Sequence, residues 1–89
     1  MLYIAWLTIV DAALNQQSRP QHLQYLDGLF RAGQVAMAGP FPDGTGGLVI
    51  YQNVDEAGAR NLAENDPAVT SGARTVTVRA WNPLQFPLS

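Results

Sequence analysis

Residues 2–10 read Leu-Tyr-Ile-Ala-Trp-Leu-Thr-Ile-Val. Apart from the aromatic residues, Thr8 is the one residue of this run with a polar side chain. β-Branched and aromatic residues dominate this run, and it is too short for a typical helix, so we expect a β-strand. Neighbouring side chains on a strand point to opposite faces. Apolar residues occupy both faces here: Leu2, Ile4, Trp6 and Val10 lie on one, and Tyr3, Ala5, Leu7 and Ile9 on the other. The pattern predicts a strand that is buried on both sides.

A helix is predicted downstream of this strand. We expect residues 11–17 to form a polar connection and the helix to begin at Ser18, because Ser18 and Gln21 have the spacing of a capping box. Pro20 falls in the first turn of such a helix, where its missing N–H costs little. Apolar residues then recur at three- and four-residue spacing, and Gly33 favours the end of the helix. The apolar stripe consists of Leu23, Leu26, Leu29 and Phe30.

The rest of the chain predicts three more strands and one more helix. Residues 34–39 and 47–52 form the two strands of a hairpin around an Asp-Gly turn. A capping box at Asn53 begins the second helix, which ends before an Asp-Pro pair at Asp66. Residues 74–81 alternate between valine or alanine and more polar side chains, which predicts the fourth strand.

The predicted order is β-α-β-β-α-β, which is that of the ferredoxin-like α+β fold. In this fold a four-stranded antiparallel sheet carries both helices on one face. Two helices cover only that face, yet the first strand presents apolar side chains on both. We therefore expect a homodimer in which the sheets of two chains face each other. The alternative is an open sheet face that binds a ligand alone.

The composition excludes several classes of protein. At 89 residues the chain has room for one domain, residues 1–89. Its basic residues are five arginines and its net charge is −2, so no basic patch is available for nucleic acid or for a membrane surface. Cysteine is absent and histidine occurs once, which excludes disulfides, thiolate nucleophiles and a multi-histidine metal site within one chain. No basic segment precedes the apolar start, so we expect no signal peptide and a cytoplasmic protein.

His22 lies four residues before Leu26 and seven before Leu29, which places its imidazole on the apolar stripe of the first helix. One interpretation is a core histidine whose nitrogens bond to the backbone or to a carboxylate. The other is a general acid or base at the edge of a pocket, because imidazole titrates near neutral pH. The spacing alone leaves both interpretations open.

Asp66 precedes Pro67 where the second helix ends. Its carboxylate has the position of an N-cap for a short turn with Pro67 as the first residue. It is also a candidate to orient His22, because the end of one helix can lie near the start of its antiparallel neighbour. The two roles are compatible, since a carboxylate has two oxygens. We expect an Asp66 oxygen within about 2.6–3.2 Å of a His22 ring nitrogen.

Two further features have both a functional and a structural interpretation. Gly44-Thr45-Gly46-Gly47 is similar in composition to a phosphate-binding loop, but it joins two strands and therefore predicts a hairpin turn. Arg79 shares a face of the fourth strand with Trp81 and is either a ligand for an anionic substrate or a solvated edge arginine.

Segments along nearly the whole chain resemble the YCII-related family of small dimeric α+β-barrel proteins. They are Met1-Leu2-Tyr3, Arg19-Pro20-Gln21-His22-Leu23, Ala38-Gly39-Pro40, Glu64-Asn65-Asp66-Pro67 and Val76-Thr77-Val78-Arg79. The resemblance implies a ferredoxin-like fold, a homodimer, and an active-site pair that maps onto His22 and Asp66, with Ser18 and Arg19 close to the same pocket. One branch of the family resembles dehydrochlorinases that act on chlorinated hydroxyquinols. The hairpin loop, residues 41–46, is shorter than the common pattern of the family.

Three hypotheses of function follow. The first is a cofactor-free enzyme that performs an elimination, an isomerisation or a hydrolysis-like step on a small polar organic molecule. His22 moves the proton and Asp66 fixes its tautomer, while Ser18, Arg19 or Arg79 holds a substrate oxygen. The second is a non-catalytic module for ligand binding or assembly, in which the pair is a structural hydrogen bond. A third hypothesis, a monooxygenase like those of related dimeric barrels, has no residue that marks it.

Overall fold

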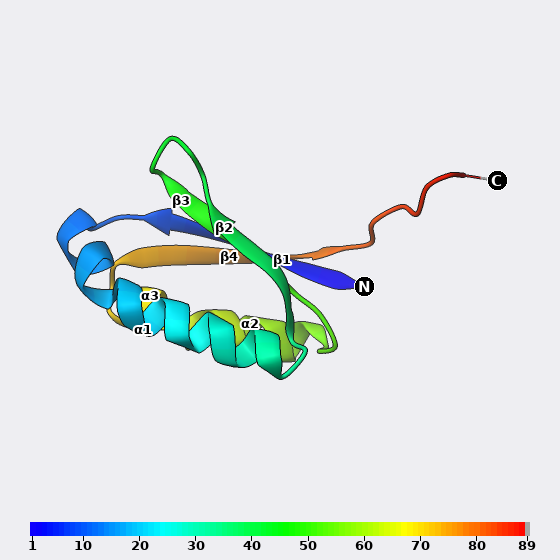
Figure 1. The fold of residues 1–89 in the computed structure, drawn as a ribbon, viewed down its shortest axis with the longest axis horizontal. Coiled ribbons are helices and arrows are strands. Elements are labelled where there is room, and N and C mark those ends of the chain that lie inside the picture. The colour runs from blue at the N-terminus through cyan, green and yellow to red at the C-terminus, as the bar shows by residue number, and fades with distance from the viewer. Residues whose placement is uncertain (89) are drawn as a thin grey trace.

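The chain alternates strands and helices in the predicted order, with one additional short helix. The computed structural model describes residues 1–88 (Figure 1). Its elements are β1 (Leu2–Ile9), α1 (Ala12–Arg31), β2 (Val35–Pro40), β3 (Gly46–Tyr51), α2 (Glu56–Glu64), α3 (Pro67–Thr70) and β4 (Arg74–Trp81). Within this part of the chain, none of the helices has the length and apolar character that a membrane span requires.

The four strands form one antiparallel sheet in the order β2-β3-β1-β4. All three helices lie on the same face of the sheet, and the residues after β4 extend away from it (Figure 1). This arrangement confirms the predicted ferredoxin-like α+β fold. The apolar first strand, β1, is an interior strand with β3 and β4 hydrogen-bonded on its two sides.

The two faces of β1 have different surroundings. Tyr3, Ala5 and Leu7 point toward the helices and are buried. On the opposite side, which we term the outer face of the sheet, Trp6 is 51% exposed. The sequence predicts that β1 is buried on both sides. Within a single chain it is buried on one side only, because every helix packs on the inner face.

The predicted start of the first helix is wrong. Asp11, not Ser18, is the N-cap, because its carboxylate accepts a backbone N–H three residues further on at 3.0 Å. Residues 12–17 are mostly alanine, leucine and glutamine, which favour helix, and they form the first turns of α1 rather than a polar connection. Ser18 lies inside the helix, where its hydroxyl donates to the Asn15 carbonyl. Pro20 also lies inside α1, which continues through it to Arg31.

The second helix also begins at a different residue from the one predicted. Its N-cap is Asp55, whose carboxylate accepts the Gly58 N–H at 2.7 Å. Asn53, the predicted cap, has a left-handed backbone with φ of 58°, and its side-chain amide donates to the Gly33 carbonyl at 2.8 Å. Asn53 therefore ties the connection before α2 to the connection after α1. The helix ends at Glu64, before Asp66, as predicted.

The core lies between the inner face of the sheet and the helices. The strands contribute its large side chains, among them Tyr51, Leu7 and Val49. Helix α2 contributes Ala59 and Ala63, which are buried and small, so this helix packs closely against the sheet. The longer α1 covers the rest of the inner face, and its side chains therefore border the space where a cavity can form.

Candidate active site

His22 and Asp66 meet in the interior on the inner side of the sheet. His22 belongs to α1 and is 6% exposed, and Asp66, in the connection between α2 and α3, is 0% exposed. The His22 Nδ1 atom lies 2.7 Å from Asp66 Oδ1 and 2.9 Å from Asp66 Oδ2. The predicted contact between the two side chains is therefore confirmed.

The local backbone holds the Asp66 carboxylate at this place. Asp66 is the N-cap of α3, with Pro67 as the first helical residue. Its Oδ1 atom accepts the Ala68 N–H at 2.9 Å while it also contacts His22 Nδ1. Helix α3 in turn packs against α1. One carboxylate is thus both the helix cap and the partner of the histidine, which are the two interpretations that the sequence left open.

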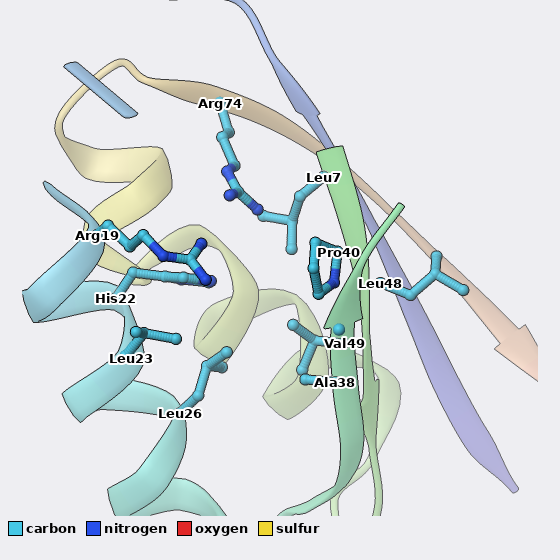
Figure 2. Close-up of a pocket in the computed structure, with 11 residues that line it drawn as sticks. Leu7, Arg19, His22, Leu23, Leu26, Ala38, Pro40, Leu48, Val49 and Arg74 are labelled. Atoms are coloured by element: carbon cyan, nitrogen blue, oxygen red, sulfur yellow. The ribbon is translucent and has the colours of Figure 1, made fainter. Parts of the chain in front are cut away.

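This contact determines which nitrogen of His22 is free. A carboxylate accepts hydrogen bonds, so Nδ1 is the donor and carries a proton. In a neutral imidazole the other nitrogen, Nε2, then holds the lone pair. His22 also lines a cavity, so Nε2 is the nitrogen that remains for a molecule bound there (Figure 2). A fixed tautomer with a free lone pair is what a general base requires.

The cavity has a volume of about 140 Å³ and lies between α1 and the sheet (Figure 2). Much of its wall is apolar. Leu23 and Leu26 of α1 face Leu7 and Val49 of the sheet across it. The segment Ala38-Gly39-Pro40 of β2 closes another side, and this is one of the segments that carry the family resemblance.

Arg19 and Arg74 add positive charge to the same cavity. Arg19 lies less than one turn before His22 on α1, and its guanidinium is directed into the cavity (Figure 2). The structure therefore places Arg19 where the resemblance implied. Arg74 is the first residue of β4 and is 6% exposed; its Nε donates to Asn15 Oδ1 at 2.7 Å. The sequence analysis does not single out Arg74, which the structure places in the wall of this cavity.

A sequence signal for Arg74 did exist. Arg74 has the same alternation along β4 as Val76 and Val78, so its side chain belongs to the inner, buried face of that strand. A charged residue in phase with buried valines is uncommon unless it has a partner or a ligand. The partner, Asn15, was assigned to a polar connection rather than to the first turns of α1, which hid the contact.

The charges around Arg74 act on its guanidinium in opposite directions. Burial, the largest effect, lowers the pKa of Arg74; the negative charge of Asp66 raises it, and the positive charge of Arg19 lowers it. An arginine side chain stays protonated in proteins, so Arg74 is a cation at neutral pH.

Nowhere in residues 1–88 do three His, Cys, Asp or Glu side chains gather as a metal site would require.

Ser18 and Arg79 are not brought to this cavity. Ser18 lines a second, wider cavity of about 340 Å³ that also has Pro67 and Thr70 in its wall, between α1 and α3. Arg79 lies opposite Ile4 in the β1–β4 pairing, so its side chain is on the outer face of the sheet. Of the three predicted substrate-binding residues, Arg19 alone lies beside His22.

Two tyrosines lie near Asp66 on the inner side. Tyr25 donates from its hydroxyl to the Leu62 carbonyl at 2.7 Å, whereas the buried Tyr51 hydroxyl has no hydrogen-bond partner among residues 1–88. Burial raises the pKa of both hydroxyls, and the negative charge of Asp66 raises them further. Both tyrosines are therefore neutral at physiological pH.

Comparisons with known proteins confirm the family resemblance. The family model described as "YCII-related domain" matches residues 1–82. The uncharacterized protein YjpA of Bacillus subtilis (strain 168) is 32% identical over 75 residues, which are 84% of this chain and 88% of that protein. A solved structure of 5-chloro-2-hydroxyhydroquinone dehydrochlorinase from Burkholderia phenoliruptrix AC1100, in complex with 2,5-dihydroxybenzoquinone, matches with a TM-score of 0.76 and 22% identity over 92% of this chain and 94% of that chain. This last likeness shows the shared fold.

Proposed function

The chain belongs to the family of YCII-related domains, and we propose that it is a cofactor-free enzyme for acid–base chemistry on a small polar organic molecule. The reaction is an elimination, an isomerisation or a hydrolysis-like step that begins with the removal of a proton. The observation that carries the proposal is the 2.7 Å contact between His22 and Asp66 at the wall of a cavity. A hydrogen bond with a purely structural role does not require a cavity at the other ring nitrogen.

In the proposed mechanism His22 Nε2 accepts a proton from the bound molecule. The imidazole becomes a cation, which the Asp66 carboxylate at Nδ1 stabilises. The Ala68 N–H holds that carboxylate in place, so the ring keeps its orientation as the charge develops. Negative charge remains on the substrate, and the Arg19 guanidinium in the same cavity faces it. In an isomerisation the proton returns from Nε2 to the substrate, and in an elimination it passes to a basic leaving group or, when chloride leaves as the anion, to water; each path restores the neutral ring.

The named activity of a protein with the same fold supports the proposed class of reaction. The solved neighbour is a dehydrochlorinase and is in complex with a hydroxylated quinone. Loss of hydrogen chloride takes a proton and a chloride ion from the substrate, and a neutral imidazole nitrogen can accept such a proton directly. We therefore include chlorinated hydroxyquinols among the first candidate substrates, together with enolisable compounds of similar size.

The proposal includes a homodimer formed through the outer face of the sheet. An apolar groove of about 470 Å³ lies on that face, lined by Ile4, Met37, Phe41, Leu48, Ile50 and Trp81 among others. Met37 is 68% exposed and Trp6 is 51% exposed, which is unusual for large apolar side chains that gather on one face. A second sheet packed against this face would bury them.

The two cavities share part of their walls. Ala38, Gly39, Pro40 and Leu48 line both the cavity beside His22 and the groove on the outer face. A second chain seated on the outer face would therefore border the active-site cavity. On this proposal, dimerisation and the shape of the substrate cavity are linked through β2 and Leu48.

Turnover assays on a panel of compounds test the proposed function. The panel contains chlorinated hydroxyquinols, for which chloride release is measured. It also contains enolisable ketones and acids, for which proton exchange with solvent is measured. We expect turnover of at least one compound, and a decrease in kcat of about 10²–10⁴-fold in His22→Ala. Gln24→Ala, an exposed position on the same helix, is the matched control and should keep the wild-type rate.

Two results would overturn the proposed function. Turnover that His22→Ala leaves unchanged would remove His22 from the mechanism. A failure of the entire panel, with intact folding, would favour the non-catalytic ligand-binding or assembly module, in which the His22–Asp66 contact is structural.

A further inference from the structure

We propose that Arg74 and Arg19 form an anion-binding subsite beside His22, and that its ligand is a small organic anion with the bulk of about one six-membered ring. The inference rests on the proposed function and gives the substrate its chemical class. In this subsite the guanidinium groups hold the negatively charged oxygens, the apolar wall holds the body of the molecule, and Nε2 of His22 faces the proton to be moved.

Arg74 is a buried cation without an acidic partner. It is 6% exposed, and its Nε donates a hydrogen bond to the neutral amide oxygen of Asn15 at 2.7 Å. Among residues 1–88 no carboxylate lies within ion-pair distance of Arg74, because the acids that form ion pairs there contact His22, Arg31 and Arg60. A buried charge without a counter-charge in direct contact is costly. The two terminal amino groups of Arg74 remain for a ligand in the cavity that the residue lines (Figure 2).

A second cation stands on the other side of the same cavity. The Arg19 guanidinium is directed into it from α1, while Arg74 enters from β4 (Figure 2). The charge of Arg19 lowers the pKa of Arg74, which is the effect of two like charges near each other. The nearby acid, Asp66, already contacts His22 Nδ1 and the Ala68 N–H. An anion between the two guanidinium groups would relieve their repulsion.

The remaining wall and the volume select the kind of anion. Leu7, Leu23, Leu26 and Val49 offer no polar side-chain atom, so an inorganic anion would leave most of the wall without a suitable contact. The volume of about 140 Å³ is close to the roughly 150 Å³ of an apolar cavity that holds benzene. A guanidinium is planar and donates two parallel hydrogen bonds to a carboxylate. A planar carboxylate or a comparable delocalised oxyanion on a small apolar body meets all three conditions.

Calorimetric titration of the full chain with three probes tests the subsite. The probes are benzoate, its neutral counterpart benzamide, and inorganic phosphate. We expect benzoate to bind at least tenfold more tightly than either of the others. Arg74→Gln should weaken benzoate binding at least tenfold. Arg60→Gln, which changes an exposed arginine on α2 paired with Glu56, is the matched control and should leave benzoate binding unchanged.

A second variant keeps the test decisive if Arg74→Gln does not fold. Arg19 is exposed on α1, so Arg19→Gln should fold normally and weaken benzoate binding several-fold. Equal affinity for benzoate and benzamide, or benzoate binding that neither variant weakens, would overturn the proposal. Phosphate that binds as tightly as benzoate would overturn the organic nature of the ligand.

The outcome is independent of the turnover assays. Benzoate binding that depends on Arg74, without turnover of any compound, would support the subsite and overturn the enzymatic function. Turnover that depends on His22, together with no preference for anions, would support the function and overturn the subsite.

Discussion

One buried carboxylate, that of Asp66, joins two parts of the chain that are distant in sequence. It contacts His22 Nδ1 on α1 and accepts the Ala68 N–H at the start of α3. Because the side chain is fully buried, neither contact can be replaced by bulk water without a rearrangement of the surrounding residues. Asp66 therefore contributes to stability in addition to its proposed part in proton transfer.

We predict that Asp66→Ala lowers the free energy of unfolding by about 2–4 kcal/mol. The substitution removes the cap of α3 and leaves a buried imidazole N–H without its acceptor. Urea denaturation measures the loss. Asp27→Ala is the control, because Asp27 contacts Arg31 at 3.0 Å on the exposed side of α1, and a pair of this kind is worth about 0.5 kcal/mol. Equal losses in the two variants would contradict the stabilising role of Asp66.

The partly buried Tyr25 and the fully buried Tyr51 should respond differently to loss of their hydroxyl. Tyr25→Phe removes a 2.7 Å hydrogen bond to the Leu62 carbonyl and should cost about 1 kcal/mol. Tyr51→Phe removes a hydroxyl without a protein partner in residues 1–88 and should be neutral or slightly stabilising at neutral pH. Urea denaturation of both variants gives the comparison. A larger loss in Tyr51→Phe than in Tyr25→Phe would show that the Tyr51 hydroxyl has a partner.

The same tyrosine predicts a pH dependence. Burial raises the pKa of Tyr51 from its ordinary value of 10.0, so the unfolded chain loses this proton at lower pH than the folded chain. Stability from this group is complete below pH 10 and decreases as the pH rises further. In Tyr51→Phe the decrease on the alkaline side should be smaller than in the wild type. Denaturation curves on either side of that pH measure it, and an unchanged alkaline slope would contradict the prediction.

Helix starts are the elements where local sequence was least informative. Ser18 and Asn53 have the residue types and spacing of caps, but Asp11 and Asp55 perform that role. Residue types that can form caps occur at more than one position around each predicted helix start, and tertiary contacts favour one of them. For α1 the contact is Arg74 to Asn15 at 2.7 Å, which joins β4 to the helix across 59 positions of sequence. A local pattern does not contain that information.

The residues of the candidate site also differ in how well local sequence predicts them. The apolar stripe of α1 predicts an inward-facing His22, and the Asp-Pro pair predicts a cap at Asp66, but it is the family resemblance that implies a functional pair. The alternation of β4 signals a buried Arg74, but its contact is predictable only if α1 begins before its partner Asn15. Arg79 was misplaced relative to the site because strand alternation fixes the faces of β4 but does not by itself say which face meets the helices.

Substitutions at the two alternative caps of α1 test this start. We predict that Asp11→Ala lowers the free energy of unfolding by about 1 kcal/mol, because a backbone N–H loses its acceptor. Ser18→Ala should change it by no more than about 0.5 kcal/mol, since Ser18 lies within the helix. Thermal denaturation of both variants decides the point. A larger loss in Ser18→Ala would restore Ser18 as the cap.

At the scale of the whole molecule, large apolar side chains are exposed on the outer face of the sheet. All three helices pack on the inner face (Figure 1), which leaves an apolar groove of about 470 Å³ on the other side. The groove and the cavity beside His22 share β2 residues and Leu48. A second chain on this face would therefore affect both the stability of the protein and access to its proposed active site.

We predict that the protein has the mass of two chains in solution and that Met37→Glu converts it to single chains. Met37 is 68% exposed in one chain, so the new charge costs little there but would be buried between two sheets. Phe30→Glu is the matched control, because Phe30 is 59% exposed on α1, away from the sheet face, and should leave the dimer intact. Light scattering measures the mass. A single-chain mass for the wild type at micromolar concentration would rule out the dimer.

The most direct test of the proposed proton transfer is the position of the His22 ring proton. A long-range nitrogen–proton NMR correlation spectrum distinguishes the two tautomers of a neutral imidazole. With Nδ1 at 2.7 Å from Asp66 Oδ1, the wild-type spectrum should show Nδ1 protonated and Nε2 with its lone pair, and Asp66→Asn should lose this preference. A neutral His22 that carries its proton on Nε2 in the wild type would have no lone pair to offer the cavity, and would contradict its role as the base.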